Sequence, residues 1–262
     1  MALRLQRQYF IMKFLGTAGW AIAKAHKPLF DENGSHLERY ARVFNAAEIN
    51  SSFYRPHRNR TYAKWAGSVP EGFRFSAKVP KTITHENRLL HAEALLKAFL
   101  GEVRGLGEKL GVLLVQLAPS HRFDTAAADA FFEAFRNEFQ GNIAIEPRHV
   151  SWASQSAQQL LQRYGVSQVI ADPQVIRVAK CLPNSFRYWR FHGAPRIYYS
   201  NYEDESLTAF SSQMQARAND VWCIFDNTAQ GFAIPNAIAM QRILLDSPRQ
   251  MHSISEERLG TL

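Results

Sequence analysis

The sequence predicts a single-domain α/β protein, a (β/α)8 barrel of the TIM type. Short apolar segments alternate with stretches of helical periodicity along the chain, without a linker or a second composition regime. Most of the apolar segments end in a polar or charged residue, as expected where the carboxyl ends of barrel strands line a site. The 262 residues, 46% of them apolar, are enough for one large core.

Eight apolar segments are predicted to be the strands of this barrel. They are residues 13–19, 43–50, 73–80, 111–119, 142–148, 167–173, 186–193 and 221–227. Helical spacing of apolar residues follows in 91–110, in 124–139 with Asp124 as a capping residue, and in 156–165 with Gly165 as the stop. This regular alternation is typical of a parallel sheet whose strands are joined by helices.

A doubly wound open sheet is the alternative architecture. Such a sheet usually binds a nucleotide at a glycine-rich turn after its first strand. Here the turn reads Gly16-Thr17-Ala18-Gly19-Trp20, which lacks the third glycine and places a bulky ring where backbone should approach a pyrophosphate. The barrel is therefore the preferred prediction.

The domain boundaries follow from the same pattern. We expect residues 1–11 to be an N-terminal extension, 12–250 to be the barrel domain and 251–262 to be a C-terminal tail. No segment has the length and apolar character of a membrane span or a signal peptide. The two cysteines, Cys181 and Cys223, are isolated, which fits a reducing compartment and predicts a cytoplasmic protein.

Strand alternation selects the residues that face the interior of the barrel. In segment 142–148, Glu146 and Arg148 share a face opposite Ile143 and Ile145, and the isoleucines suit packing against helices. The same reasoning, applied to the ends of the other strands, selects Glu48, Asn50, Lys78, Gln116, Asp172, Arg190, His192, Asp226 and Asn227. So many ionisable groups at one opening indicate a ligand site, and the alternative is an internal salt-bridge network that closes the barrel.

A segment rich in basic and aromatic residues follows the second strand. We expect Tyr54 and Arg55, near the strand end, to contribute to the site, because aromatic rings and guanidinium groups bind planar or anionic ligands. Arg60 and Lys64 fit better on the solvated face of a helix whose Trp65 packs inward.

Several motifs together resemble the DUF72 family, also called YecE-like proteins, from Phe14 to about Met240. They are GTAGW, EINSSFYRP, FRFSAKVPKTITH, LGVLLVQLAPS, EPRHVSW, DP, YWRFHG and FDNTAQGFAIPNA. The resemblance implies a TIM-barrel-like fold and no particular reaction. Its motifs imply a site at the strand ends selected above and add His85.

The leading hypothesis is an enzyme that uses general acid/base chemistry on an anionic or polyhydroxylated small molecule, such as a phosphate, sugar phosphate or nucleotide-like compound. Glu146 and His192 are the candidate base and acid, with Glu48 as a second carboxylate. The candidate substrate-binding residues are Asn50, Tyr54, Arg55, Lys78, His85, Gln116, Arg148, Asp172, Arg190 and Asn227. Among them, Lys78, Arg148 and Arg190 would hold the anion.

Two alternatives remain open at this point. Glu146, Asp172 and His192 could hold a divalent metal in a hydrolase or a nuclease-like enzyme, although no cofactor is predicted in the leading hypothesis. Alternatively, the barrel could be a non-catalytic module that binds a metabolite or RNA. The formal net charge of +8 favours anionic partners, nucleic acid among them.

Overall fold

Parallel strands form one sheet that closes into a barrel in the computed structural model, which describes residues 13–176, 186–215 and 220–246. Within these residues the strands are β1 (Lys13–Ala18), β2 (Ala46–Ile49), β3 (Arg74–Lys78), β4 (Leu110–Gln116), β5 (Asn142–Glu146), β6 (Val166–Gln168), β7 (Ile170–Asp172), β8 (Arg187–Phe191) and β9 (Val221–Phe225). Their hydrogen-bonded order is β6-β5-β4-β3-β2-β1-β9-β8-β7.

The predicted sixth strand changes its partner halfway along. Strands β6 and β7 stand at the two ends of the sheet order, yet only Val169 separates them in the chain. The first part pairs with β5 and the second with β8, while the amide of Val169 donates to the carbonyl of Ile145 at 2.8 Å. The sheet thus has the eight strand positions of the predicted barrel, because β6 and β7 together occupy one position. We call the change of partner at Val169 the seam of the sheet.

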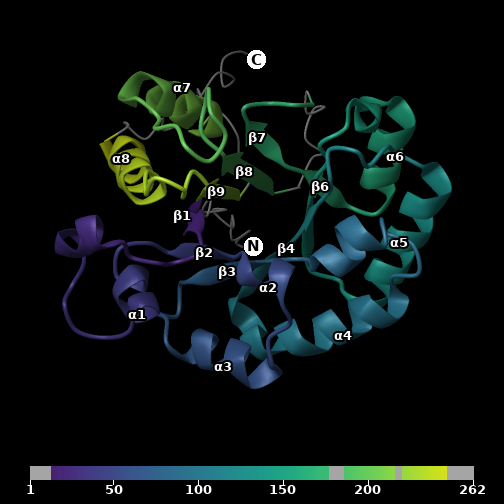
Figure 1. Ribbon diagram of the computed structural model, residues 1–262, viewed down its shortest axis with the longest axis horizontal. Helices are drawn as coiled ribbons and strands as arrows, with labels where there is room; N and C mark the ends of the chain where they lie inside the picture. The colour runs from purple at the N-terminus through teal and green to yellow at the C-terminus, as the bar shows by residue number, and fades with distance from the viewer. Residues whose placement is uncertain (1–12, 177–185, 216–219, 247–262) are drawn as a thin grey trace, which may run out of the picture.

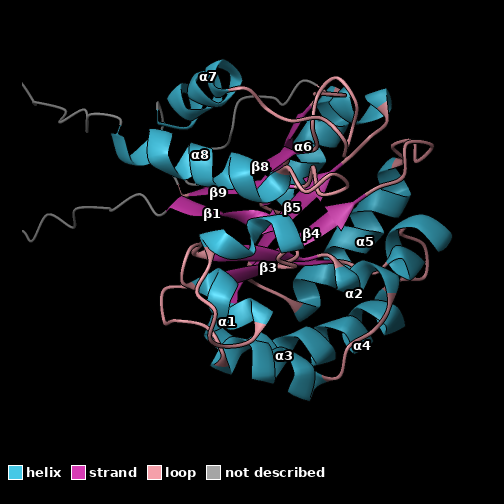
Figure 2. Cartoon of the chain, turned by 60° about the vertical axis from the view of Figure 1, so that its left-hand side comes forward, coloured by secondary structure: helices cyan, strands magenta, loops and turns pink. Residues whose placement is uncertain are grey.

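Helices cover the outside of the barrel (Figure 1). The α-helices of the described residues are α1 (His36–Ala41), α2 (Ser51–Tyr54), α3 (Asn59–Gly67), α4 (Glu93–Val103), α5 (Thr125–Glu138), α6 (Gln155–Arg163), α7 (Asp204–Gln215) and α8 (Ala233–Asp246). The short turns are η1 (Lys24–Leu29), η2 (Thr82–Glu86, a π-helix), η3 (Arg104–Lys109) and η4 (Val150–Ala153). Figure 2 shows α3 and α4 on one side of the strands and α7 and α8 on the other.

The local signals that predicted helix ends are found in the structure. Asp124 caps α5 by accepting a hydrogen bond from the amide of Ala127 at 2.8 Å, and Gly165 follows α6 with a φ of +58°. The predicted helix 91–110 is shorter than expected, because its second half becomes η3, where Gly107 has the non-helical angles φ 51° and ψ −134°.

Two apolar cores lie on the two faces of the sheet. The inner core fills the barrel and includes Phe14, Leu114, Tyr188 and Trp222, with the rings of Phe14 and Trp222 stacked at 4.7 Å. The outer core packs the helices onto the strands and contains Ile143 and Ile145, as alternation predicts. Since apolar side chains fill the barrel interior, its charged residues gather above this layer, toward the carboxyl ends of the strands.

The junction of β1 and β2 depends on a tyrosine from α1. The Tyr40 hydroxyl accepts a hydrogen bond from the amide of Thr17 at 2.7 Å and donates to the carbonyl of Ala46 at 3.0 Å. A Cβ on Gly16 would lie 1.9 Å from that carbonyl oxygen and 2.7 Å from the hydroxyl. The first glycine of the GTAGW motif therefore leaves room for the bridge between the strands.

The Gly16→Ala variant should lose stability, because backbone or Tyr40 must shift to admit a methyl group. We expect its free energy of unfolding in urea to fall by about 1–3 kcal/mol. Gly101→Ala is the matched control, since a Cβ on Gly101 in α4 meets nothing within 4 Å. Alanine there should be neutral or add up to about 1 kcal/mol. Equal stability of the two variants would contradict this account of the junction.

Candidate functional site

Five ionisable side chains meet above the inner core at the carboxyl end of the barrel. We call Glu48, Glu146, Arg190, His192 and Asp226 the buried charge cluster. They come from β2, β5, the end of β8 and the end of β9, and each is at most 5% exposed. Carboxyl ends of parallel strands converge at this end of a barrel, which explains how residues so far apart in the chain become neighbours.

Arg190 is the centre of the cluster. Its Nε and Nη2 donate to the two carboxylate oxygens of Glu48 at 3.0 and 2.7 Å, a bidentate pairing. Its Nη1 lies 2.5 Å from Glu146 Oε2, and its Nη2 also lies 3.0 Å from Asp226 Oδ2. One guanidinium therefore joins carboxylates from three strands.

His192 completes the ring of interactions. Its Nε2 lies 2.9 Å from Glu146 Oε1 and its Nδ1 lies 3.1 Å from Asp226 Oδ2. Burial alone would lower the pKa of His192, but the charge of Glu146 and the hydrogen bonds to both carboxylates raise it above its usual value. An imidazolium, with both nitrogens donating, fits this position.

Glu146 and Asp226 of the cluster are held ionised. Burial favours their neutral form, yet Arg190 and His192 together keep the pKa of Glu146 well below its usual range and also lower the pKa of Asp226. Both oxygens of Glu48 are engaged, one of them also by the Tyr188 hydroxyl at 3.0 Å. The cluster thus has the internal pairing expected of a salt-bridge network.

Lys78, at the end of β3, is a cation beside this network. It is 5% exposed, and its amine makes no hydrogen bond or ion pair within the part of the chain that the structure describes. The Nζ lies 4.1 Å from the centroid of the Phe53 ring. Burial and the nearby charge of Arg190 lower the pKa of Lys78 to about 8.

Three further predicted residues surround Lys78 and Glu146 on the solvent side. Gln116 Nε2 donates to Glu146 Oε2 at 3.2 Å, and Arg148 Nε lies 3.7 Å from Glu146 Oε1. The ring of His85 packs edge-on against the ring of Phe53, with 4.9 Å between the two centroids. The same Phe53 ring faces the amine of Lys78. Burial, together with the charges of Lys78 and Arg148, lowers the pKa of His85.

Other predicted site residues lie away from the cluster. Tyr54 is 66% exposed and, with Arg55, lines a separate hollow of about 230 Å³ between α2 and α4. Asn227 is fully buried and donates to Ser200 O and to Asn236 Oδ1. Tyr54, Arg55 and Asn227 therefore do not belong to the buried charge cluster.

Asn50 and Asp172 have different surroundings. Asn50 follows β2, and its buried Oδ1 has no hydrogen-bond partner among the described residues. The Asp172 carboxylate accepts a hydrogen bond from the Tyr202 hydroxyl at 2.8 Å. Of the proposed metal ligands, Glu146 and His192 are neighbours, but no three His, Cys, Asp or Glu residues among those described are arranged to hold a metal.

The third acid of the centre is Asp226, not Asp172. The sequence places Asp226 at a strand end, but strand ends offer several polar residues and do not show which one turns inward. Tyr188 and Ser76, whose hydroxyls are 2.6 Å apart beneath Glu48, are polar side chains of this centre that were not among the predicted site residues. Alternation could have found both, since they share faces with Arg190 and Lys78.

Known proteins share this sequence pattern and fold. The family described as "Protein of unknown function DUF72" matches residues 14–259. The chain belongs to the DUF72 family. The match confirms the resemblance seen in the sequence motifs, and with the sheet topology it confirms the predicted barrel.

Individual relatives of this DUF72 protein agree with that assignment. It is 30% identical to UPF0759 protein YecE of Escherichia coli O157:H7 over 150 residues, 55% of this chain and about half, 54%, of that relative. It is 24% identical to UPF0759 protein YunF of Bacillus subtilis, covering 89% of this chain and 95% of the relative. A crystal structure of a DUF72 family protein from Enterococcus faecalis has a TM-score of 0.75 at 25% identity, covering 90% and 97% of the two chains.

No helix among the described residues of this DUF72 protein has the length and apolar character needed to cross a membrane. Residues 1–11 and 251–262, predicted to be an extension and a tail, lie outside the described residues.

The raised pKa of His192 predicts a pH-dependent contribution to stability. A group whose pKa is higher in the folded state stabilises the protein at low pH and loses this effect as pH rises through the folded pKa. The difference in unfolding free energy between the DUF72 protein and its His192→Gln variant should therefore shrink from about pH 6 to about pH 9. Urea denaturation across this range measures it.

His91→Gln is the control for this experiment, because His91 is exposed. Its stability difference from the parent protein should stay flat over the same range. A His192→Gln difference that stays constant or grows with pH would show that His192 is not held as the imidazolium.

Proposed function

We propose that this protein binds a small molecule carrying a phosphate or carboxylate group at the barrel mouth and acts on it by proton transfer. The anion would sit between Lys78 and Arg148, above the buried charge cluster. One observation carries the proposal: Lys78 is a cation at the mouth with no hydrogen bond or ion pair of its own among the described residues.

The charge balance of the mouth supports an anionic ligand. Glu48, Glu146 and Asp226 supply three negative charges, and Arg190 with the imidazolium of His192 balances two of them. When Lys78 and Arg148 are protonated as well, four cations face three carboxylates. A net positive charge in a partly buried position attracts an anion more strongly than the same charge on an open surface.

The carboxylates themselves are poorly placed to bind a ligand directly. Their oxygens accept hydrogen bonds from Arg190, His192 and Tyr188. A ligand or metal that took one of these oxygens would leave a buried donor without its partner. The cluster is therefore better suited to fixing the positions of Gln116 and Arg148 through Glu146 than to binding a substrate.

His85 is the side chain best poised for proton transfer. A lowered pKa keeps its imidazole neutral near pH 7, so that it can accept a proton. Its Nδ1 lies 2.9 Å from the Thr84 hydroxyl, which orients the ring. By contrast, Glu146 and His192 hold each other in charged forms, and either would have to break a buried hydrogen bond to exchange a proton.

The uncompensated polar atoms of the mouth suit a hydroxylated ligand. The Oδ1 of Asn50 is buried and has no hydrogen-bond partner within the ranges that the structure describes, and such an atom costs free energy until a donor reaches it. A hydroxyl group of a sugar phosphate or a hydroxy acid is a donor of suitable size. The proposed substrate is thus a small phosphorylated or carboxylated compound that also bears hydroxyl groups.

Sulfate is a useful probe of the anion site because its charge does not change between about pH 6 and pH 10. We expect isothermal titration calorimetry to detect sulfate binding that weakens as pH rises through about 8, where Lys78 loses its proton. Lys78→Met should weaken this binding about tenfold or more and reduce its pH dependence.

Lys97→Met removes the same charge from the exposed face of α4 and should leave sulfate binding unchanged. If Lys78→Met binds sulfate as well as the parent protein, Lys78 does not hold the anion. If both variants weaken binding equally, only the net charge matters and the mouth is not the site.

Turnover tests the catalytic part of the proposal. A panel of sugar phosphates and hydroxy acids can be followed by proton NMR with the parent protein and with His85→Asn. We expect His85→Asn to slow the turnover of any substrate by about 100-fold or more while its binding persists. Equal rates would remove His85 as the acid/base, and binding to the mouth without any turnover would leave only the anion site.

A further inference from the structure

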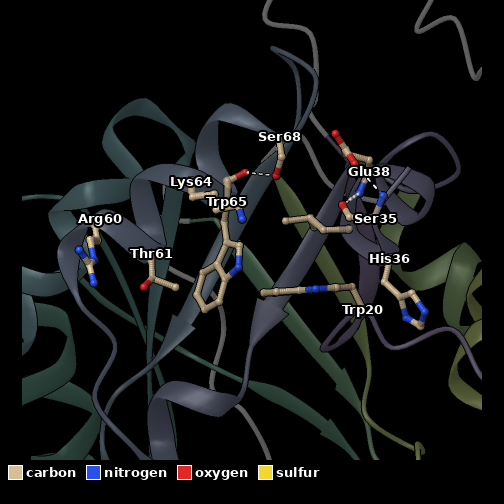
Figure 3. A pocket seen from close by; sticks show the side chains of 10 residues that line it. Trp20, Ser35, His36, Glu38, Arg60, Thr61, Lys64, Trp65 and Ser68 are labelled. Carbon is tan, nitrogen blue, oxygen red and sulfur yellow. Dashed lines mark hydrogen bonds between the residues drawn. The ribbon is translucent and has the colours of Figure 1, made fainter. Parts of the chain in front are cut away.

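A second region with the features of a binding site lies outside the barrel, between α1 and α3. A cavity of about 790 Å³ opens there, a volume typical of small-molecule sites. Its lining comes from the start of α1, from α3, and from Trp20 after β1 (Figure 3). We call it the α1–α3 cavity. No residue of the buried charge cluster lines it, so it is separate from the barrel mouth.

Two tryptophans form the aromatic part of this lining. Trp20 and Trp65 are half-buried, and their rings meet edge-to-face with centroids 5.1 Å apart. Trp20 also rests against Phe75 in the core, while Trp65 packs against His57 and Tyr62. These ring contacts hold both indoles in position. Because the two rings do not stack on each other, ring surface remains for a ligand in the cavity.

Two cations stand beside these rings on α3. Arg60 and Lys64 are one helical turn apart, and Thr61 and Trp65 form the adjacent pair, so all four line the same wall. Both cations are exposed, and neither makes an ion pair or a side-chain hydrogen bond within the described ranges. Figure 3 shows Lys64 next to Trp65, with Arg60 beyond Thr61.

The acid in the lining is already occupied. Glu38 Oε2 accepts a hydrogen bond from the Ser35 amide at 2.7 Å as part of the capping box of α1. Arg60 and Lys64 against this one carboxylate leave the lining with a net positive charge. Charge complementarity therefore favours an anion, and the indoles favour a flat ring attached to it.

We propose that the α1–α3 cavity binds a small anion bearing a planar aromatic ring, with the ring against Trp65 and Trp20 and the anionic group at Arg60 and Lys64. A nucleoside monophosphate has this chemistry. Base rings stack on aromatic side chains largely irrespective of their identity, and guanidinium and ammonium groups bind phosphate. The cavity gives a function to the basic and aromatic residues of segment 60–65 that the barrel mouth does not use.

Adenosine 5′-monophosphate (AMP) is the probe for this site. Equilibrium dialysis of the full chain should detect AMP binding, and the double variant Arg60→Ala/Lys64→Ala should weaken it about tenfold or more. Both residues are exposed, so the variant should fold normally. In the Lys78→Met protein, whose mouth site is disabled, adenosine, which lacks the phosphate, and ribose 5-phosphate, which lacks the aromatic ring, should each bind more weakly than AMP.

Two control variants separate this site from other causes. Lys97→Ala/Arg242→Ala removes two exposed charges from α4 and α8 and should not change AMP binding. Lys78→Met disables the proposed anion site of the mouth and should also leave AMP binding intact. Trp65→Phe keeps an aromatic ring and should bind AMP better than Trp65→Leu does.

Several results would overturn the proposal. One is the absence of AMP binding at millimolar concentration, and another is equal AMP binding by the parent and the Arg60→Ala/Lys64→Ala protein. A third is loss of AMP binding in Lys78→Met, which would place AMP at the mouth. In the Lys78→Met protein, ribose 5-phosphate binding as tightly as AMP would show that the indoles recognise no aromatic ring. None of these results bears on sulfate binding at the mouth, so the two proposals can fail separately.

Discussion

The guanidinium of Arg190 is the interaction on which the upper half of the barrel depends. It contacts carboxylates from β2, β5 and the end of β9 while being fully buried itself. Taking these charges out of water is costly, and only complete pairing makes the arrangement tolerable. The bidentate contact with Glu48 and the contacts with Glu146 and Asp226 thus fix the distances between strands across the barrel interior.

This network divides the barrel interior into layers. Below it, Phe14, Leu114 and Trp222 fill the barrel with apolar side chains. Above it, Lys78 and Arg148 face the mouth, and Arg148 lies close to Glu146 of the network. The buried carboxylates contribute to the electrostatic potential around these upper cations, so the salt-bridge network and the proposed anion site are two parts of one arrangement.

The segment after β2 shows how one stretch of chain serves several surroundings. Phe53 supports Lys78 at the mouth, Tyr62 is buried in the outer core, and Trp65 lines the α1–α3 cavity with Lys64. Phe53 belongs to α2, whereas Tyr62 and Trp65 belong to α3, where they are three positions apart and their rings meet edge-to-face at 5.3 Å. The basic and aromatic residues of this segment are thus distributed over two helices, and they contact the barrel mouth, the outer core and the α1–α3 cavity.

The sequence by itself determined the strands, the helices and the end of the barrel at which the charges gather. Apolar periodicity is local, and the carboxyl ends of parallel strands always meet at one opening, so Glu48, Glu146 and Arg190 could be placed there. Alternation also separated Ile143 and Ile145 from the interior, as the outer core shows. The seam at Val169 could not be foreseen, since it depends on which strands pair when the sheet closes.

Only the tertiary structure decided which of these side chains are partners. Arg190 and Glu48 are 142 positions apart, and no local spacing specifies that they meet in a bidentate pair. The same closure brings Asp226, and not Asp172, to Arg190, and it leaves Lys78 without a hydrogen bond or ion pair among the residues that the structure describes. Distances across a closed barrel depend on its register and on the packing of its interior, and these are properties of all the strands together.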